Sequence, residues 1–161
     1  MLNCKPEDTP HQPGLYLSAQ MCPADEAERE DMKSIPYCRL VGSLNYIATM
    51  TRPDICYAVN ALCQFMKNPG QAHWKAAKRV LRYLKGTATY GPKFSFNEKA
   101  PVSYCDSDFA GDPDKHRSTS GIVCLMANGT LIWRSQRQKV TAESSVEAEY
   151  MALSLASREI K

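Results

Sequence analysis

The sequence predicts an α+β fold in two parts: a small three-helix bundle, and then a three-strand antiparallel meander with one closing helix. Three segments of helical period occupy residues 37–86, and from residue 101 the pattern changes to period-two alternation broken by an Asn-Gly turn. The chain has 161 residues, of which 43% are hydrophobic and 23% charged. These values are typical of a globular chain with one ordinary domain or two small ones.

The cysteines indicate a reducing compartment. All seven are scattered along the chain and none forms a Cys-x-x-Cys pair, so neither a disulfide framework nor a structural zinc site is predicted. We find no signal peptide and no apolar run long enough to span a membrane. We therefore expect an intracellular protein, in the cytoplasm or nucleus, that is not secreted and has no membrane partner.

Residues 1–36 predict an irregular lead-in, because prolines and a glycine interrupt any periodic pattern there. Within it, residues 24–33 are rich in charge and predict a short helix that Pro36 ends.

Three helices are predicted over residues 37–86. Tyr37–Met50 carries one apolar stripe. The second helix begins at Pro53, a good first helical position, and continues to the Asn68-Pro69-Gly70 stop. The third covers Gln71–Lys85, with Gly86 as its C-terminal cap. Short connections between them favour a small bundle.

The third helix has a basic face opposite its apolar one. The basic residues are Lys75, Lys78, Arg79, Arg82 and Lys85, and the apolar ones are Trp74, Ala77, Val80, Leu81 and Leu84. Five cations on one stripe repel one another unless they are solvated or meet an anion. Two interpretations stay open: a solvated exterior, or a surface that contacts nucleic-acid phosphates.

Residues 87–100 predict a linker with a strand over 93–96, and the meander follows. Its turn is assigned to Asn128-Gly129, a strong hairpin signal. The three predicted strands are Val102–Asp108, Ser118–Met126 and Thr130–Ser135.

Two acids are candidates for a metal site. On the first strand, Val102, Tyr104, Asp106 and Asp108 share a face that begins apolar and ends in carboxylates. On the last helix, about 100° per residue places Glu149 inside an apolar stripe. That stripe contains Val146, Ala152, Leu153, Ala156 and Ile160. An inward carboxylate needs a cation or an ion-pair partner, so Mg²⁺ (or Mn²⁺) and a buried salt bridge both remain open.

Other titratable residues have simpler roles. Ser144 and Glu147 match a capping box that starts the last helix, which accounts for Glu147. Asp112-Pro113-Asp114 is typical of a turn. His11, His73 and His116 lack ligand spacing and are predicted to be structural or exposed on the surface.

Several motifs, in order, resemble one known family. They are Asn3-Cys4-Lys5-Pro6, Tyr37–Ile55, His73–Gly86, Asp106–Asp112, Arg117–Gly121, Trp133 with Ser135 and Gln138, and Glu147–Ala152. Together they cover nearly the whole chain and resemble the Ty1/copia-type retrotransposon polyproteins, in the region where reverse transcriptase passes into ribonuclease H.

The resemblance implies a domain order and site residues. Residues 1–36 would end the polymerase palm, 37–86 would form a thumb-like bundle, 87–100 a linker, and 101–161 the start of a ribonuclease H-like domain. Asp106 and Glu149 would bind the metal ions and act in catalysis. The implied partners are an RNA–DNA hybrid or duplex, gripped through the Lys75–Lys85 face, and the rest of the polyprotein.

The chain also departs from that family. It lacks the polymerase aspartate pair, so we expect no DNA synthesis. Ribonucleases H add at least two further acids in later elements that are absent up to Lys161. Phe109 stands where the family commonly has Trp, and Glu143 where it has an apolar residue. We therefore expect little or no activity from this chain alone.

Three functions remain as hypotheses. The first is a polyprotein fragment whose parent cleaves RNA in RNA–DNA hybrids with Mg²⁺. The second is a non-catalytic nucleic-acid-binding module. The third is a structural fragment that self-associates or docks through an exposed sheet edge.

Overall fold

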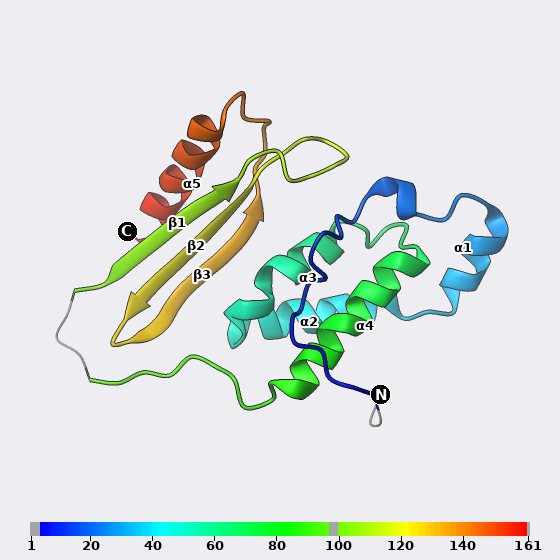
Figure 1. Cartoon of the computed structure of the whole chain (residues 1–161), viewed down its shortest axis with the longest axis horizontal. Coiled ribbons are helices and arrows are strands. Elements are labelled where there is room, and N and C mark those ends of the chain that lie inside the picture. Colours follow the sequence, from blue (N-terminus) through cyan, green and yellow to red (C-terminus); the bar gives the residue numbers. More distant parts are fainter. Residues whose placement is uncertain (1–3, 97–99, 161) are drawn as a thin grey trace. The chain divides into compact units, whose positions relative to one another are not determined.

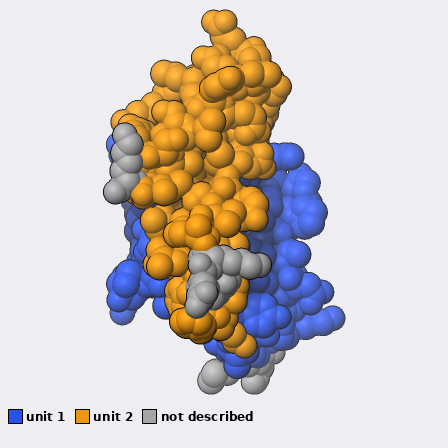
Figure 2. All heavy atoms as spheres, turned by 90° about the vertical axis from the view of Figure 1, so that its left-hand side faces the viewer, with its two compact units in different colours: residues 1–90 blue, residues 91–161 orange. Residues whose placement is uncertain are grey.

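The computed structural model describes residues 4–96 and 100–160. The chain divides into two compact units, Met1–Tyr90 and Gly91–Lys161, coloured separately in Figure 2. The first unit is helical, and the second contains a three-strand antiparallel sheet with one helix, as Figure 1 shows. The α+β class predicted from the sequence is confirmed. Among the residues described, no helix is long and apolar enough to cross a membrane.

The first unit consists of short 3-10 turns and four helices joined by tight connections. In chain order they are η1 (Ala19–Met21), α1 (Glu26–Lys33), α2 (Tyr37–Met50), η2 (Pro53–Ile55), α3 (Cys56–Cys63) and α4 (Gln71–Gly86). The apolar faces of α2, α3 and α4 form one core. Its fully buried side chains include Val41, Leu44, Val59, Leu62 and Val80.

Two helix ends differ from the prediction. The helix from Pro53 starts as a 3-10 turn and its α-helical part ends at Cys63, well before the Asn68-Pro69-Gly70 stop, because turns follow. Gly86 is the last residue of α4 and is not its cap, which is Thr87. A Cβ at Gly86 would lie 3.0 Å from Pro6 Cβ, a tight contact, so glycine favours the close approach of the N-terminal segment.

A buried arginine joins the α2–α3 corner to the end of α4. Arg52 is only 5% exposed and donates to both carboxylate oxygens of Asp54, at 2.9 and 2.7 Å, and to the Thr87 carbonyl at 2.9 Å. The Tyr83 hydroxyl donates to Asp54 at 2.8 Å. Burial would raise the pKa of Asp54, but the hydrogen bonds from Arg52 and Tyr83 outweigh it and lower that pKa.

His73 is also structural. It is fully buried at the start of α4, its Nδ1 accepts from the Gly70 amide at 2.9 Å, and its ring stacks on Phe65 at 4.1 Å. The prediction of a structural or surface histidine at this position is thus confirmed in its structural form.

The second unit is built on strands β1 (Val102–Asp108), β2 (Thr119–Met126) and β3 (Gly129–Arg137), in the spatial order β1-β2-β3. Both pairs are antiparallel, which is the predicted meander. Residues 93–96 form no strand, contrary to the prediction, although the Ser95 amide donates to the Ala127 carbonyl at 2.8 Å.

The β2–β3 turn lies one residue earlier than predicted. Ala127 and Asn128 have φ of 51° and 59°, and Met126 pairs with Gly129, so the two-residue loop is Ala127-Asn128. Gly129 already belongs to β3. A Cβ there would lie 2.5 Å from Phe94 Cδ1 and 2.7 Å from the Lys93 carbonyl oxygen, so its glycine serves close packing.

Helix α5 (Ser145–Glu159) packs on one face of the sheet, against β1 and β2 (Figure 1). Gln138 ties the two layers together: its Nε2 donates to Ser107 Oγ at 3.1 Å, to Ser120 Oγ at 3.0 Å, and to the Ala148 carbonyl at 2.9 Å. The face of β1 that carries Ser107 is therefore the one under α5.

Candidate functional site

The last helix starts as predicted. Ser144 is the N-cap of α5, and its Oγ accepts from the Glu147 amide at 3.2 Å. The Glu147 carboxylate accepts a hydrogen bond of 2.7 Å from the amide of Glu143, the residue before the N-cap. Glu147 is thus engaged in starting the helix, and Glu159 at the other end of α5 pairs with Arg134 of β3 at 2.6 Å. Glu149 is the remaining acid of α5.

Glu149 reaches the outer edge of β1. Its Oε1 lies 3.4 Å from the Ser107 amide nitrogen, which donates to it. The amides of an antiparallel strand point alternately to the partner strand and away from it. The Ser107 amide donates to Glu149 and therefore points away from β2, towards the edge of β1 that has no partner strand in the described sheet. The helix therefore delivers a carboxylate to the residue that directly follows Asp106.

Glu149 is exposed, which corrects the prediction that it points into the core. The buried row of α5 is Ala148, Ala152 and Ala156, of which Ala152 and Ala156 belong to the predicted stripe and Ala148 does not. Val146 and Leu153, assigned to the buried stripe from the sequence, are 62% and 52% exposed. The alanines face the sheet because their short side chains let the helix backbone approach it closely.

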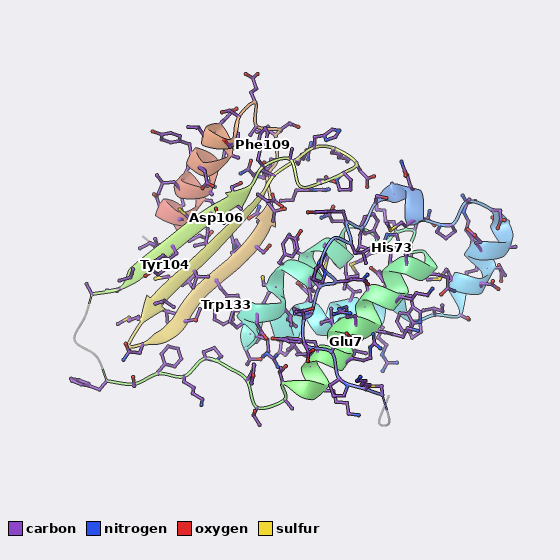
Figure 3. The ribbon with its side chains drawn as sticks, in the orientation of Figure 1. Glu7, His73, Tyr104, Asp106, Phe109 and Trp133 are labelled. Carbon is purple, nitrogen blue, oxygen red and sulfur yellow. The ribbon has the colours of Figure 1, made fainter. Side chains whose placement is uncertain are left out.

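Asp106 lies in β1 and is exposed (Figure 3). Alternation along the strand puts its side chain on the face opposite that of Ser107, away from α5. The two acids therefore do not share a face, contrary to expectation, and approach the same edge position from its two sides. Because the Ser107 nitrogen is bonded to the Asp106 carbonyl carbon, Glu149 Oε1 lies at most about 6 Å from Asp106 Cα.

Asp108 has a structural role. One of its carboxylate oxygens accepts a short hydrogen bond from the Thr119 amide, which fastens the end of β1 to the start of β2. A Cβ at Gly111 would lie 2.3 Å from Asp108 Oδ2, so the following loop folds closely over this carboxylate. Burial raises the pKa of Asp108, the Thr119 hydrogen bond opposes the rise, and nearby Asp106 and Asp112 add to it.

The prediction that Asp112 has a structural role in a turn is confirmed. Its Oδ1 accepts from the Asp114 amide at 3.1 Å, and its Oδ2 pairs with Arg137 at 2.7 Å. Asp108 and Asp112 are thus both engaged in holding the end of β1 and the loop that follows it.

The described residues contain no preassembled cluster of metal ligands. Over residues 4–96 and 100–160, no group of three or more His, Cys, Asp or Glu side chains could hold a metal ion. Proteins often hold Mg²⁺ with one or two carboxylates, because this ion keeps several waters and takes oxygens from substrate phosphate. Asp106 and Glu149 are two exposed carboxylates near one position of β1, but they project from opposite faces of the strand.

The basic face of α4 is partly covered by the N-terminal segment. The Glu7 carboxylate pairs with Arg79 at 2.8 Å and with Arg82 at 2.5 Å. Lys85 donates to the Cys4 carbonyl at 2.8 Å. Sequence reasoning missed Glu7, because a contact between residues so far apart in the chain leaves no local pattern.

The other half of the face is more open. Lys75 is exposed, and the Lys78 ammonium lies 5.6 Å from the centre of the Trp74 ring. A pocket of about 680 Å³ is lined by both lysines and by several aliphatic side chains. Its lining includes Leu15, Leu17, Ala58, Leu62, Ala76 and Val80.

Comparison with known proteins gives relatives along the whole chain. A retrovirus-related Pol polyprotein from transposon TNT 1-94 of Nicotiana tabacum is 41% identical over 162 residues, which are 99% of this chain and 12% of that protein. The Pol polyprotein from transposon RE2 of Arabidopsis thaliana is 40% identical over 164 residues, which are 100% of this chain and 11% of that protein.

A shorter relative also exists. Secreted RxLR effector protein 161 of Plasmopara viticola is 48% identical over 129 residues, which are 80% of this chain and 91% of that protein. No family model matches the chain. No solved structure matches it either.

The chain spans only about one ninth of the length of these two polyproteins. It is similar to them at about 40% identity from one end to the other. The chain is therefore a homologue of one segment of the retrovirus-related Pol polyproteins of transposons.

Proposed function

We propose that this segment is the part of a Pol polyprotein where a reverse-transcriptase thumb passes into ribonuclease H. The parent protein would act inside the cell and cleave the RNA strand of an RNA–DNA hybrid. The observation that carries the proposal is the 3.4 Å contact from the Ser107 amide, which brings Glu149 to the residue that directly follows Asp106 in β1.

Each residue has a stated part in this reaction. Asp106 and Glu149 would hold Mg²⁺ or Mn²⁺, and the Ser107 amide orients the Glu149 carboxylate. When bound, such ions activate the attacking water and stabilise the leaving oxygen of the phosphodiester. Because two carboxylates leave most ligand positions to water, metal affinity and cleavage by this chain alone are expected to be weak.

A labelled-hybrid assay tests this proposal. The chain is incubated with an RNA–DNA hybrid labelled on the RNA strand, at increasing Mg²⁺ or Mn²⁺, beside Asp106→Asn and the matched variant Asp31→Asn on the exposed part of α1. We expect little or no cleavage by the chain. Any cleavage should need metal and be lost in Asp106→Asn but not in Asp31→Asn. Cleavage that survives Asp106→Asn would refute the assignment of this site.

The second candidate function is non-catalytic binding of nucleic acid by the first unit. It is favoured by the basic face of α4, where Lys75 is exposed and Lys78 lies over Trp74. Binding should weaken as salt rises, survive Glu149→Gln, and be lost when Lys78, Arg79 and Arg82 become Glu. If these charge reversals leave binding unchanged, the face is a solvated exterior.

The rest of the polyprotein is the remaining proposed partner. Strand β1 is an edge of the described sheet, so a further strand could pair along it or a second copy could associate there. Glu149 already occupies the Ser107 amide of that edge, which limits pairing at this position. Concentration-dependent sedimentation would detect self-association, and a strictly monomeric chain would count against it.

A further inference from the structure

The Glu7 carboxylate is bound as a small anion would be. Its Oε2 lies 2.8 Å from Arg79 Nη1 and its Oε1 lies 2.5 Å from Arg82 Nη2, so each oxygen has its own guanidinium. The two arginines are three residues apart and therefore neighbours on the face of α4. We call Arg79 and Arg82 the anion fork. In this structure it binds the Glu7 carboxylate.

A nucleic-acid phosphate matches this fork. A phosphodiester has two non-bridging oxygens on one atom, as a carboxylate does, and arginine guanidinium groups bind both kinds of anion through paired N–H groups. Lys75 and Lys78 lie on the same helix face, one turn nearer the N-terminus of α4. A backbone that contacts these two lysines and continues along α4 reaches the fork.

The segment that carries Glu7 is held to α4 by few polar contacts. Arg79 donates to the Thr9 carbonyl at 3.1 Å and to Thr9 Oγ1 at 2.9 Å, and Lys85 donates to the Cys4 carbonyl at 2.8 Å. All of these are contacts from the cations of the basic face. The side chains of Arg79, Glu7 and Arg82 are 20%, 24% and 36% exposed, so these ion pairs are partly open to solvent and a polyanion can compete for the same cations.

We propose that nucleic-acid phosphate displaces Glu7 from the Arg79–Arg82 fork, so that the N-terminal segment 4–9 acts as a built-in competitor for part of the basic face. This inference rests on the proposed binding of nucleic acid by α4. It adds that only Lys75 and Lys78 are available at first, and that full contact requires segment 4–9 to leave the helix.

Binding of a short fluorescein-labelled RNA–DNA hybrid, followed by anisotropy over a range of salt concentrations, tests the proposal. Glu7→Gln removes the competing charge, and Glu30→Gln on the exposed face of α1 is the matched control with the same change in net charge. Glu7→Gln should bind roughly tenfold more tightly at low salt than Glu30→Gln. The slope of log K against log salt should be nearly the same for both variants, because their complexes contact the same phosphates once Glu7 is displaced.

A triple variant checks which cations are responsible. Adding Arg79→Gln and Arg82→Gln to Glu7→Gln should cancel the tighter binding and make the salt slope shallower than that of wild type by about 1.8, as the loss of two phosphate contacts requires. Equal affinity for Glu7→Gln and Glu30→Gln overturns the competitor role while leaving the proposed binding intact. Absence of binding by wild type and Glu7→Gln alike, even at low salt, overturns both.

A measurement on the wild-type chain covers the case in which Glu7→Gln does not fold. Cys4 is half-buried beside Lys85, so its alkylation rate reports whether segment 4–9 has left α4. The rate, followed by mass spectrometry of the peptide, should rise severalfold when the hybrid binds. An unchanged or slower rate with bound hybrid shows that the segment stays in place and refutes the proposal.

Discussion

The Ser107 amide donates to Glu149 Oε1 at 3.4 Å and thereby ties the start of α5 to the free edge of β1. This contact places the helix acid next to Asp106 although the two acids project from different sides of the strand. The site depends on this edge geometry, because neither side chain is buried and no third ligand group is found in the described part of the chain. A metal held there would remain largely hydrated.

Metal binding should depend on both acids and not on their acidic neighbour. We expect weak Mg²⁺ or Mn²⁺ binding by isothermal titration, reduced at least roughly tenfold in Asp106→Asn and in Glu149→Gln, since each removes one of two carboxylate ligands. Glu143→Gln is the control, because the Glu143 side chain is exposed near the same helix end. Equal loss in all three variants would indicate a general charge effect and contradict the assignment.

The fold could be predicted where the sequence signals are local. Helical period located α2 and α4, alternation located β1, and the Ser144 cap located the start of α5. The predicted hairpin turn, Asn128-Gly129, is one residue too late in the chain. Asn-Gly favours a left-handed backbone, but the pairing of Met126 with Gly129 requires that conformation at Ala127 and Asn128.

The site was less predictable because its geometry is set by packing. Sequence periodicity singled out Glu149 but predicted a buried position for it, because the predicted stripe included the exposed residues Val146 and Leu153 beside the buried Ala152 and Ala156. The basic face of α4 was visible in the sequence, whereas its pairing with Glu7 joins distant segments and has no local pattern.

The Arg52–Asp54 pair should make the first unit sensitive to acid. The pKa of Asp54 is lower in the folded state than its unfolded value of 3.8. The ionised Asp54 therefore stabilises the fold at pH values above 3.8, and this contribution is lost as the pH falls through the lower folded-state pKa. At pH 7, Asp54→Asn should lower the free energy of unfolding by about 1–2 kcal/mol. The difference from wild type should shrink below about pH 4.

Urea unfolding followed by tryptophan fluorescence measures this difference. The chain has two tryptophans, Trp74 in the first unit and Trp133 in the second, so Trp133→Phe leaves a probe of the first unit alone. Asp31→Asn on the exposed side of α1 is the control. A difference that stays constant from pH 7 to pH 3 would show that ionisation of Asp54 is not the cause.

Gln138 should be the most costly polar residue to truncate in the second unit. Gln138→Ala removes an amide group whose two N–H groups are shared among three acceptors, from a side chain that is 7% exposed, and it leaves the Ala148 carbonyl facing a void. The expected loss is about 2–3 kcal/mol of unfolding free energy, measured in a Trp74→Phe background so that Trp133 reports. Lys139→Ala, at the exposed neighbouring position, should cost less than about 0.5 kcal/mol.

The β2–β3 turn gives two substitutions of opposite sign. Ala127 adopts φ of 51°, a conformation that costs a residue with a Cβ about 1–2 kcal/mol, so Ala127→Gly should raise the unfolding free energy by up to about 1 kcal/mol after the greater flexibility of unfolded glycine is subtracted. Gly129→Ala should lower it by about 1–3 kcal/mol, because the new Cβ meets the Phe94 ring and the Lys93 carbonyl. Both are read from urea midpoints with Trp133 as the probe. If Gly129→Ala were neutral and Ala127→Gly destabilising, the loop would be Asn128-Gly129 after all, since the sequence signal and the register place the left-handed residues one position apart.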